Sequence, residues 1–364
     1  MVKRAAENYA SAGVDMDKAE EGVRRLLEWV GKSLNLRKTI GSSRLDIGYF
    51  ANVIKIAPNL GLALSTDGVG TKVLVAQMMK KFDTIGIDCI AMNVNDVICV
   101  GAEPISMLDY IAIEDPKPEL LEEIGKGLYK GAELANVSIV GGEVSQIKEI
   151  IKGEKKGYGI DLVGMCVGII ALDKINIGQN VKENEVVIGL RSSGVHSNGL
   201  TLARNVFFAK NKFKADKYFP ELRRTIGEEL LEPTHIYVRE IMEMLRKGVR
   251  IKSLSNITSD GLLNLARAKA KTGYVIDNLP EPHPVFNLIQ KIANISDEEM
   301  FKVFNMGIGF CVVVPEKDAD KVIRIAKKYR VAASRIGYTV KDPDKMVYIK
   351  QKNLIGRDNN FYKN

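Results

Sequence analysis

The chain has 364 residues, more than one hydrophobic core usually covers, so two domains are expected. Its 53 basic and 45 acidic residues are interleaved and give a formal net charge of +8 at pH 7. No apolar run reaches the roughly 18 residues of a membrane span, and no basic face with stacking aromatic groups indicates a nucleic-acid module. We therefore expect no membrane and no nucleic-acid partner, whereas the positive charge suits anionic small molecules.

The first part of the chain, residues 1–172, is predicted to form one α/β domain. An amphipathic helix is expected at 17–31, where Val23, Leu26 and Val30 share a stripe. A second helix is expected at 83–100, and its apolar residues cover most of its circumference, which predicts burial. The other expected elements are strands near 50–57, 60–66, 105–113, 137–140 and 158–171 and a helix at 118–135.

A second domain is predicted at residues 173–347, followed by a polar, loosely held tail at 348–364. Strands again alternate with helices, so the fold class is α/β in both halves. The expected elements are strands at 186–190, 250–257, 308–314 and 333–340 and helices from 200 and at 233–247, 261–270, 296–304 and 316–329.

The N-terminus and the cysteines indicate a cytoplasmic protein. The first fifteen residues contain no apolar segment of the signal-peptide type. The four cysteines lie scattered in apolar segments without a CxxC motif or a metal-type spacing. We therefore expect buried thiols in a reducing compartment.

A short segment, TDGVGTK (66–72), follows the predicted strand at 60–66. Asp67 is a possible metal ligand, and Lys72 is a point charge that suits an anion. Gly68 and Gly70 allow backbone N–H groups to turn toward a ligand where a Cβ would clash. The segment is neither a Walker loop nor a GxGxxG motif, so a tight turn with an incidental lysine is the alternative to a phosphate and cation site.

Polar residues also interrupt the apolar helix at 83–100. At about 100° per residue, Asp88 and Asn95 share a stripe and Asp96 lies roughly 80° away from it. Buried carboxylates are costly unless they are paired or bound to a metal. The structural alternative is an internal salt bridge or a helix cap, and the functional alternative is Mg²⁺ shared with Asp67 and with Glu143 of the loop VGGE (140–143).

A third polar segment, SSGVHSNG (192–199), contains one of the three histidines of the chain. His196 lies there among serines and next to Asn198, between two glycines. A lone histidine is usually a surface or core residue. In this loop it is also a candidate proton carrier or oxyanion partner. A fourth glycine-rich loop, FNMGIG (304–309), is expected to accompany these sites.

In this order the segments resemble the phosphoribosylformylglycinamidine cyclo-ligase family, also called aminoimidazole ribonucleotide synthetases. The resemblance covers roughly residues 9–340. Its motifs are YASAGVDMDKAEE, TDGVGTK, KFDTIGIDCIAMNVNDVICVGAEP, VGGE, RSSGVHSNGLTLAR, LLEPTHIYV and EEMFKVFNMGIGF. No single motif is specific, but their combination is.

The resemblance implies a cytoplasmic enzyme of purine biosynthesis with two α/β domains. It further implies a homodimer in which N-terminal strands pair into a barrel, with ATP and Mg²⁺ bound near the interface. The implied reaction converts formylglycinamidine ribonucleotide and ATP to aminoimidazole ribonucleotide, ADP and phosphate. Phosphoryl transfer to the formyl oxygen makes a good leaving group, and the ribose-bearing amidine nitrogen then attacks the formyl carbon.

The resemblance also assigns roles to the residues of these segments. Asp67, Asp96 and Glu143 would hold Mg²⁺ with support from Asp88, and Lys72 would contact phosphate oxygens. His196 and Asn198 would lie near the reacting formylamidine, with Lys72 as the third catalytic residue. The expected ATP site comprises Asp67, Gly68, Gly70, Thr71, Lys72, Asp88, Asn95, Asp96, Gly141, Gly142 and Glu143.

The sequence departs from the family pattern in three segments. GGEVSQIKEI replaces GGET with its following AxMP, so that Val144 stands in place of a hydroxyl. NITSDG (256–261) replaces HITGGG and introduces Asn256, Ser259 and Asp260. The glycine-rich start is reduced to GSSRLDIG (41–48). These changes allow two alternatives: a divergent paralogue that phosphorylates another small acceptor, or a catalytically weak nucleotide-binding subunit.

Relatives of the same architecture are less similar in their motifs. A selenophosphate synthetase would show a reactive cysteine in an N-terminal glycine-rich loop, and a hydrogenase-maturation dehydratase would end in a cysteine. A thiamine monophosphate kinase would lack SSGVHSNG and EEMFKVFNMGIG. This chain has both of these motifs and ends in KN.

Overall fold

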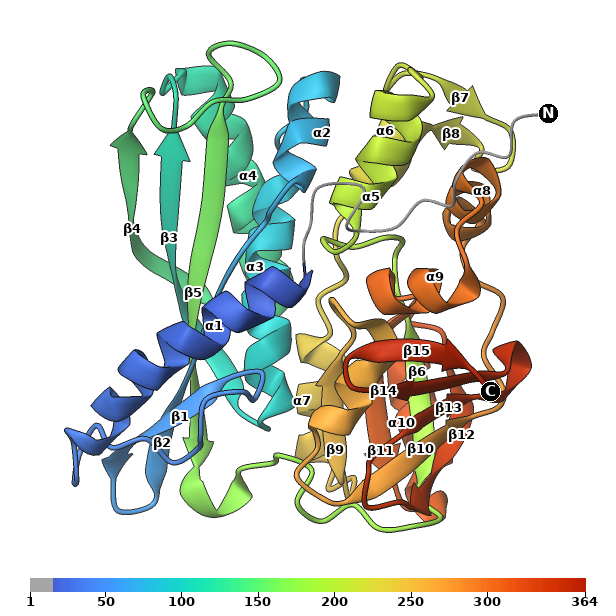
Figure 1. The fold of residues 1–364 in the computed structure, drawn as a ribbon. Coiled ribbons are helices and arrows are strands. Elements are labelled where there is room, and N and C mark those ends of the chain that lie inside the picture. The colour runs from blue at the N-terminus through green and yellow to red at the C-terminus, as the bar shows by residue number, and fades with distance from the viewer. Residues whose placement is uncertain (1–15) are drawn as a thin grey trace.

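A computed structural model describes residues 16–364 of the chain. The beginning of the motif at 9–21 therefore lies outside the described residues. Two α/β units lie side by side, one from each half of the chain (Figure 1). The predicted fold class is confirmed, and in the described part of the chain no helix is long and apolar enough to cross a membrane.

The N-terminal unit is a five-stranded sheet covered by helices on one face. Its strands lie in the order β1-β2-β5-β3-β4, and only β3 and β4 run parallel, joined through α4. The buried helix α3 packs on β2, β5 and β3, with α4 against it. The elements are α1 (Met16–Val30), β1 (Asn52–Ala57), β2 (Leu60–Gly68), α2 (Lys72–Met79), α3 (Ile85–Cys99), β3 (Glu103–Ile113), α4 (Pro118–Ala135), β4 (Ser138–Gln146) and β5 (Ile160–Ala171).

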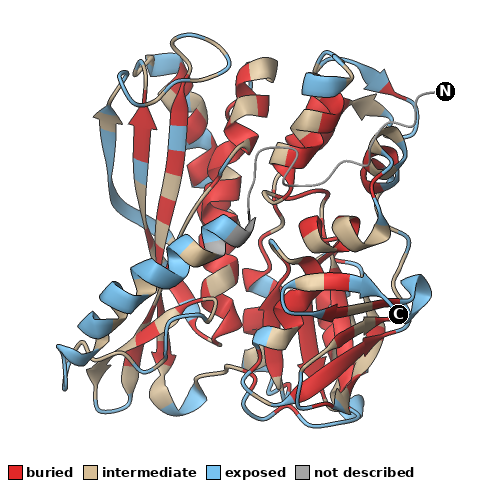
Figure 2. Cartoon of the chain, in the orientation of Figure 1, coloured by how far each residue is buried: buried red, intermediate tan, exposed pale blue. Residues whose placement is uncertain are grey.

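Exposed apolar side chains occur on β3 and β4 in the single chain, on both faces of the sheet. Val140 is 67% exposed and Val144 47%, and Ile105, Tyr110 and Ile139 are also exposed. The apolar stripe of α1 is exposed as well, with Leu26 at 59%, so the predicted helix is present but its stripe is not buried (Figure 2). Exposed apolar side chains on an edge strand and its neighbour are typical of an interface.

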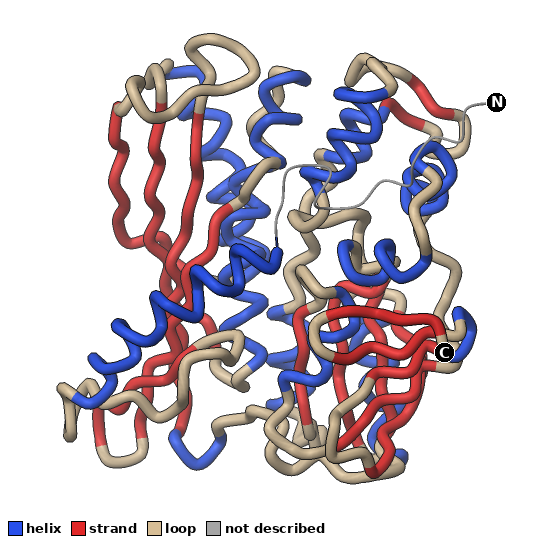
Figure 3. The backbone as a smooth tube through the Cα atoms, viewed as in Figure 1, coloured by secondary structure: helices blue, strands red, loops and turns tan. Residues whose placement is uncertain are grey.

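The C-terminal unit is an eight-stranded sheet in the order β15-β14-β13-β10-β12-β6-β11-β9 (Figure 3). Its strands are β6 (Val186–Arg191), β9 (Ser253–Asn256), β10 (Thr272–Ile276), β11 (Ile308–Val314), β12 (Ala333–Lys341), β13 (Val347–Ile349), β14 (Leu354–Arg357) and β15 (Asn360–Lys363), with a small hairpin of β7 (Tyr218–Phe219) and β8 (Arg224–Thr225) apart from them. Its helices are α5 (Leu200–Arg204), α6 (Ile226–Leu230), α7 (Val238–Arg246), α8 (Pro284–Ala293), α9 (Asp297–Val303) and α10 (Glu316–Lys328).

Most predicted elements are confirmed, but four segments differ. VGGE is not a loop, because it lies inside β4. The helix predicted at 233–247 begins only at Val238, because the preceding segment is held by hydrogen bonds to the N-terminal unit. The predicted helix at 261–270 is a short 3₁₀ helix, Gly261–Arg267. Apart from these differences in predicted segments, helix α8 and strand β10 were not among the predicted elements.

The C-terminal tail is the fourth difference. It was predicted to be loosely held, but β14 and β15 extend the large sheet as a hairpin, and β15 packs on α9. Phe361 is 5% exposed, and its ring meets Phe301 edge-on at 6.2 Å between centroids. The prediction was wrong because the segment has few apolar residues, yet Leu354 and Phe361 among them lie on the covered face.

The hairpin yields a stability prediction. Phe361→Ala is expected to lower the free energy of unfolding by about 3 kcal/mol, because a buried aromatic side chain is lost and a cavity remains. Tyr362→Ala is the matched control. Tyr362 is the next residue in the chain and is 43% exposed, so the loss of its side chain is expected to change stability little. Urea denaturation of both variants measures the difference. Equal losses in the two variants would show that the hairpin is not packed through Phe361.

A carboxylate joins α7 to α10. Hydrogen bonds from Lys328, then from Tyr329 and Lys247, lower the pKa of Glu243 to about 2. A lowered pKa means that the folded protein favours the ionised form. The stabilisation is therefore complete above the pKa of the unfolded chain, about 4.5, and is lost as the pH falls through about 2.

This linkage predicts a pH-dependent stability difference. The free energy of unfolding of the unaltered protein is expected to exceed that of Glu243→Gln by a constant amount above about pH 5, because the folded Glu243 stays ionised there. The difference should shrink steadily between pH 4.5 and 2. Urea denaturation across this range measures it, with Glu119→Gln on the exposed first turn of α4 as the control. A pH-independent difference would contradict the assigned ion pairs.

Candidate functional site

The segment TDGVGTK connects the end of β2 to the start of α2. Gly70 has a φ of +68°, a left-handed conformation that glycine adopts without strain, and it is exposed. Thr71 Oγ1 lies 3.1 Å from Thr201 Oγ1, and this contact joins the segment to the C-terminal unit. Because α2 begins at Lys72, the exposed backbone at Gly70 and Thr71 lies at a helix N-terminus, where anions bind favourably.

Lys72 itself does not face a phosphate site. Its side chain is fully buried, and Nζ donates to Asp88 Oδ1 at 2.9 Å and to the backbone oxygen of Glu232 at 2.6 Å. The predicted role in binding phosphate is therefore corrected. The sequence did not reveal this because the partner that neutralises Lys72 lies on α3.

Asp88 is the centre of a buried hydrogen-bond network between the two units, which we call the junction network. It comprises Lys72, Asp88, Ser197 and Thr234. Asp88 Oδ1 accepts from Lys72 Nζ, from Ser197 Oγ at 3.1 Å, and from the backbone N and Oγ1 of Thr234 at 2.8 and 2.6 Å. The structural alternative for Asp88, an internal salt bridge, is thus present, and the carboxylate is fully buried, with no hydrogen-bond partner found for its Oδ2.

Asn95 also has a structural role. Its Nδ2 donates to the backbone oxygen of His235 at 2.8 Å, and its Oδ1 accepts from the backbone N of Tyr237 at 3.0 Å. Asn95 is fully buried, so its predicted contact with a cofactor is corrected. The two hydrogen bonds hold the backbone of the segment before α7 outside the helix, which explains the late start of that helix.

Asp67 lies near the end of strand β2, and its side chain lies on the face of the sheet that α3 covers. Its partner in the sheet is Gly164, where a Cβ would lie only 2.7 Å from Asn93 Nδ2 of α3. Asp67 is half-buried, and burial raises its pKa although the N–H of Gly68 donates to Oδ1 at 2.7 Å. The Gly68 N–H is therefore already used within the protein.

Asp96 lies near Asp67 on the same side of the sheet. Burial raises the pKa of Asp96 to about 7, the hydrogen bond from Asn256 opposes this shift, and the negative charge of Asp67 adds to it. Asn256 Nδ2 donates to Asp96 Oδ1 at 2.9 Å. Two carboxylates with raised pKa values lack sufficient positive charge nearby, so their oxygens suit a hard divalent cation such as Mg²⁺.

Glu143 does not join these two carboxylates. It is exposed on β4 and pairs in register with Tyr110, whereas its neighbour Gly142 pairs with Asp109 on the helix-covered face. Successive side chains of a strand point to opposite faces, so Glu143 lies on the opposite side of the sheet from Asp67. Among the described residues, no group of three acidic, histidine or cysteine side chains is placed to hold a metal ion. The predicted set Asp67, Asp96 and Glu143 is thus not assembled within one chain.

Asp109 is an acidic residue of this face that the sequence did not single out. Asp67, Gly164, Asp109 and Gly142 form one row across β2, β5, β3 and β4. A Cβ on Gly142 would lie 2.6 Å from the Asp109 carboxylate, so glycine is required there. Burial raises the pKa of Asp109. The strand alternation of SMLDYIAI was the available signal, since it places Asp109 on the same face as the buried Met107.

His196 is buried rather than exposed in its loop. It has a φ of +64°, and its Nε2 accepts a hydrogen bond from the backbone N of Ser193 at 3.0 Å. Burial, followed by the nearby charge of Lys72, lowers its pKa well below the ordinary value. His196 is therefore neutral at neutral pH and holds the loop in shape; it is not positioned as a proton donor.

Asn198 is half-buried, and Ser259 Oγ donates to its Oδ1 at 3.0 Å. The residues of NITSDG that depart from the family pattern thus contact the predicted site residues. Asn256 forms a hydrogen bond with Asp96, and Ser259 forms one with Asn198. Asp260 has a φ of +68°. The altered segment therefore lies beside the site, which also explains how Asp96 remains partly compensated.

Comparison with known proteins identifies relatives along nearly the whole chain. Residues 48–170 match the family described as AIR synthase related protein, N-terminal domain, and residues 182–350 match its C-terminal domain. The phosphoribosylformylglycinamidine cyclo-ligase of Methanocaldococcus jannaschii is 47% identical over 333 residues, which are 91% of this chain and 92% of that protein.

Solved structures share the fold at low sequence identity. Thiamine-monophosphate kinase from Stenotrophomonas maltophilia K279a is similar with a TM-score of 0.59 at 16% identity, covering 88% of this chain and 94% of that chain. T. maritima PurL complexed with ATP has a TM-score of 0.54 at 12% identity, covering 82% of this chain and 44% of that chain.

Proposed function

The chain belongs to the phosphoribosylformylglycinamidine cyclo-ligase family, and on that premise we propose how its own residues support the ATP-dependent cyclisation that defines the family. The reaction forms aminoimidazole ribonucleotide, ADP and phosphate from formylglycinamidine ribonucleotide and ATP, in purine biosynthesis. Phosphoryl transfer requires little covalent chemistry from an enzyme, so the protein mainly positions the reactants and neutralises charge.

The observation that carries the proposal is the pair Asp67 and Asp96. Both carboxylates have raised pKa values, and they lie near each other beside the exposed backbone of Gly70 and Thr71. We assign Mg²⁺ to these two carboxylates, which would hold the ion where its charge would offset that of the triphosphate. Mg²⁺ is commonly held by one or two carboxylates together with phosphate oxygens and water.

The remaining residues act by binding and positioning. Backbone N–H groups at Gly70 and Thr71 hold phosphate oxygens at the N-terminus of α2. Asn198, on the loop shaped by His196, orients the formylamidine. Lys72 and Asp88 hold this loop and the ATP-binding segment together through the junction network. Glu143 lies on the opposite face of the sheet and takes no part in the site of its own chain.

The activity is tested directly with purified protein. Formylglycinamidine ribonucleotide and MgATP should yield aminoimidazole ribonucleotide, measured colorimetrically, and ADP in equal amounts. ATP binding without turnover would instead indicate a nucleotide-binding subunit. ADP formation with a different acceptor and no ring closure would indicate a paralogue.

The exposed apolar side chains of β3 and β4 support a homodimer, and the free cysteines support a reducing, cytoplasmic compartment. Strand β4 is the edge strand of this sheet, and Val140 on it is 67% exposed. The four cysteines are free and buried, as expected for a reducing compartment. A second copy covering β4 and its neighbours would bury this surface and protect the sheet edge.

Dimerisation yields a prediction with a matched control. Val140→Glu is expected to shift the protein to monomers, because a charge buried in an apolar interface is strongly unfavourable. Tyr129→Glu is the control, since Tyr129 is 69% exposed on α4, on the other side of the sheet. Light scattering after size exclusion measures the mass of each variant. A Val140→Glu protein that stays dimeric would place the interface elsewhere.

A further inference from the structure

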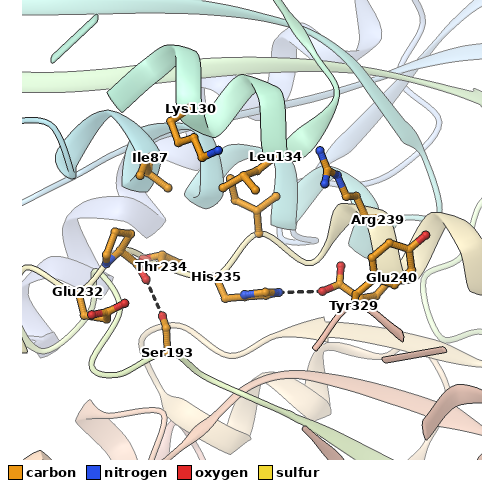
Figure 4. Close-up of a pocket in the computed structure, with 12 residues that line it drawn as sticks. Ile87, Lys130, Leu134, Ser193, Glu232, Thr234, His235, Arg239, Glu240 and Tyr329 are labelled. Atoms are coloured by element: carbon orange, nitrogen blue, oxygen red, sulfur yellow. Dashed lines mark hydrogen bonds and ion pairs between the residues drawn. The ribbon is translucent and has the colours of Figure 1, made fainter. Parts of the chain in front are cut away.

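A second pocket lies between the two units, separate from the carboxylates of the proposed ATP site. It has a volume of about 310 Å³, within the range of small-molecule sites. Figure 4 shows it between α3 and α4 on one side and the segment 232–240 on the other. Ile87, Leu134 and Ile236 give it an apolar wall.

Glu240 supplies a buried acceptor at one end of this pocket. The residue is 2% exposed, and His235 Nε2 donates to its Oε1 at 2.8 Å. Its Oε2 is buried without a hydrogen-bond partner. In Figure 4 one carboxylate oxygen points to His235, and the other points to the side of the pocket where Arg239 lies. An unpartnered carboxylate oxygen is costly, and an N–H donor on a ligand would offset that cost.

Two cations flank the opening of the same pocket. Arg239 of α7 is exposed; its Nη2 donates to the backbone oxygen of Glu133 at 2.7 Å, and its charge also acts on the Glu133 carboxylate. Lys130 of α4 is 55% exposed and pairs with the exposed Glu133, a contact that is weak in solvent. The guanidinium and the ammonium therefore favour an anionic group at the opening, and arginine suits phosphate in particular.

We propose that this pocket binds a ribonucleoside monophosphate whose base carries an exocyclic amine. The amine donates to Glu240 Oε2, the base lies on the apolar wall, and the phosphate meets Arg239 and Lys130. A free amino acid also carries an amine and an anion, but it would leave much of the volume and the apolar wall uncovered. Two sources share the required chemistry: adenosine monophosphate, and the aminoimidazole ribonucleotide that the proposed reaction produces.

The pocket is coupled to the active site through one segment. Glu232 and Thr234 both line the pocket. Thr234 is a member of the junction network, and Glu232 contacts that network. The backbone oxygen of Glu232 accepts from Lys72, and Thr234 donates to Asp88. A nucleotide bound in the pocket would therefore contact the same segment that holds the two units together.

Binding is measured by calorimetry on the full chain, with the proposed ATP site saturated by a non-hydrolysable ATP analogue and Mg²⁺. Adenosine monophosphate is expected to bind at one site per chain and inosine monophosphate about tenfold more weakly, because its base presents an oxygen to Glu240 in place of the amine. Aminoimidazole ribonucleotide is titrated in a parallel experiment, and the tighter of the two amine-bearing ligands identifies the source. Binding that the ATP analogue abolishes would place the nucleotide in the ATP site and overturn the proposal.

Two variants make the test independent of folding. Glu240→Gln keeps an oxygen for His235 and turns an amide N–H₂ toward the ligand, so the preference should reverse in favour of inosine monophosphate. Arg239→Ala should weaken the binding of adenosine monophosphate by about tenfold, because one contact with a charged group is lost. The binding of adenosine, which has no phosphate, should be unaffected. Arg246→Ala, on the same helix but outside the pocket, is the control and should bind normally.

The outcomes separate this proposal from the cyclisation itself, because binding is read without turnover. An unchanged preference in a folded Glu240→Gln variant would contradict the role of Glu240. Equal weakening by Arg239→Ala and Arg246→Ala would contradict the phosphate position. Absence of binding by all three nucleotides at millimolar concentration would overturn the site as a whole.

Discussion

Asp88→Ala is expected to lower the free energy of unfolding by about 3–5 kcal/mol, because removing one partner of a buried ion pair leaves the other charge uncompensated. Lys72 and Asp88 are both fully buried. The substitution also removes the acceptor of three further hydrogen bonds from Ser197 and Thr234. Urea denaturation followed by fluorescence and by circular dichroism measures the loss.

An exposed ion pair of the same type is the matched control. Glu122 and Lys126 pair on the surface of α4, where both side chains are about two-thirds exposed. Glu122→Ala is therefore expected to cost no more than about 0.5 kcal/mol, as is usual for surface pairs. Lys72→Met combined with Asp88→Leu should cost less than the sum of the single changes, because no buried charge remains. An additive double variant would show that the two groups do not interact.

Asp67→Asn is expected to lower turnover about a hundredfold or more, because a carboxylate that holds Mg²⁺ contributes several kcal/mol of charge stabilisation. The fold should survive the change. Asp67 Oδ1 accepts only from the N–H of Gly68 among the hydrogen bonds found for it, and the asparagine oxygen retains that contact. Colorimetric detection of aminoimidazole ribonucleotide against Mg²⁺ concentration measures both the loss and any weaker metal affinity.

Asp161→Asn serves as the control for this substitution. Asp161 is exposed on β5 and is paired in register with Ala112, three positions from Gly164, the partner of Asp67. It carries the same charge in the same sheet, so general electrostatic effects should be similar. Its turnover is expected to stay within about twofold of the unaltered protein, as for surface changes away from a site. If the turnover of Asp67→Asn were as high as that of Asp161→Asn, Asp67 would not be a ligand of Mg²⁺.

Hydrophobic periodicity predicted most elements because it reports local burial. Helix α3 was identified from its nearly continuous apolar surface, and β5 from its long apolar run. The errors fall where tertiary contacts override the local pattern. The segment before α7 is helical by pattern, but Asn95 and Asp88 hold its backbone in another conformation. The tail is polar by composition, but Phe361 anchors it on Phe301.

The sequence by itself determined which groups this protein has for its chemistry: acidic residues beside glycines, at the ends of strands, in an order that identifies the family. Strand alternation, which depends only on the backbone, also relates Asp109 to the buried Met107, although Asp109 was not singled out from the sequence. The sequence did not determine which acids meet. That choice depends on which face α3 covers and on the register of β3 and β4.

Only the tertiary structure decided that Lys72 and Asn95 turn inward and that Glu143 lies behind the sheet. The physical reason is that a charge is placed by its partners, and these partners lie far away in the sequence. Lys72 is 16 residues from Asp88 and 160 from Glu232, yet it is bonded to both. A local pattern contains no information about such pairs, whereas burial makes them obligatory.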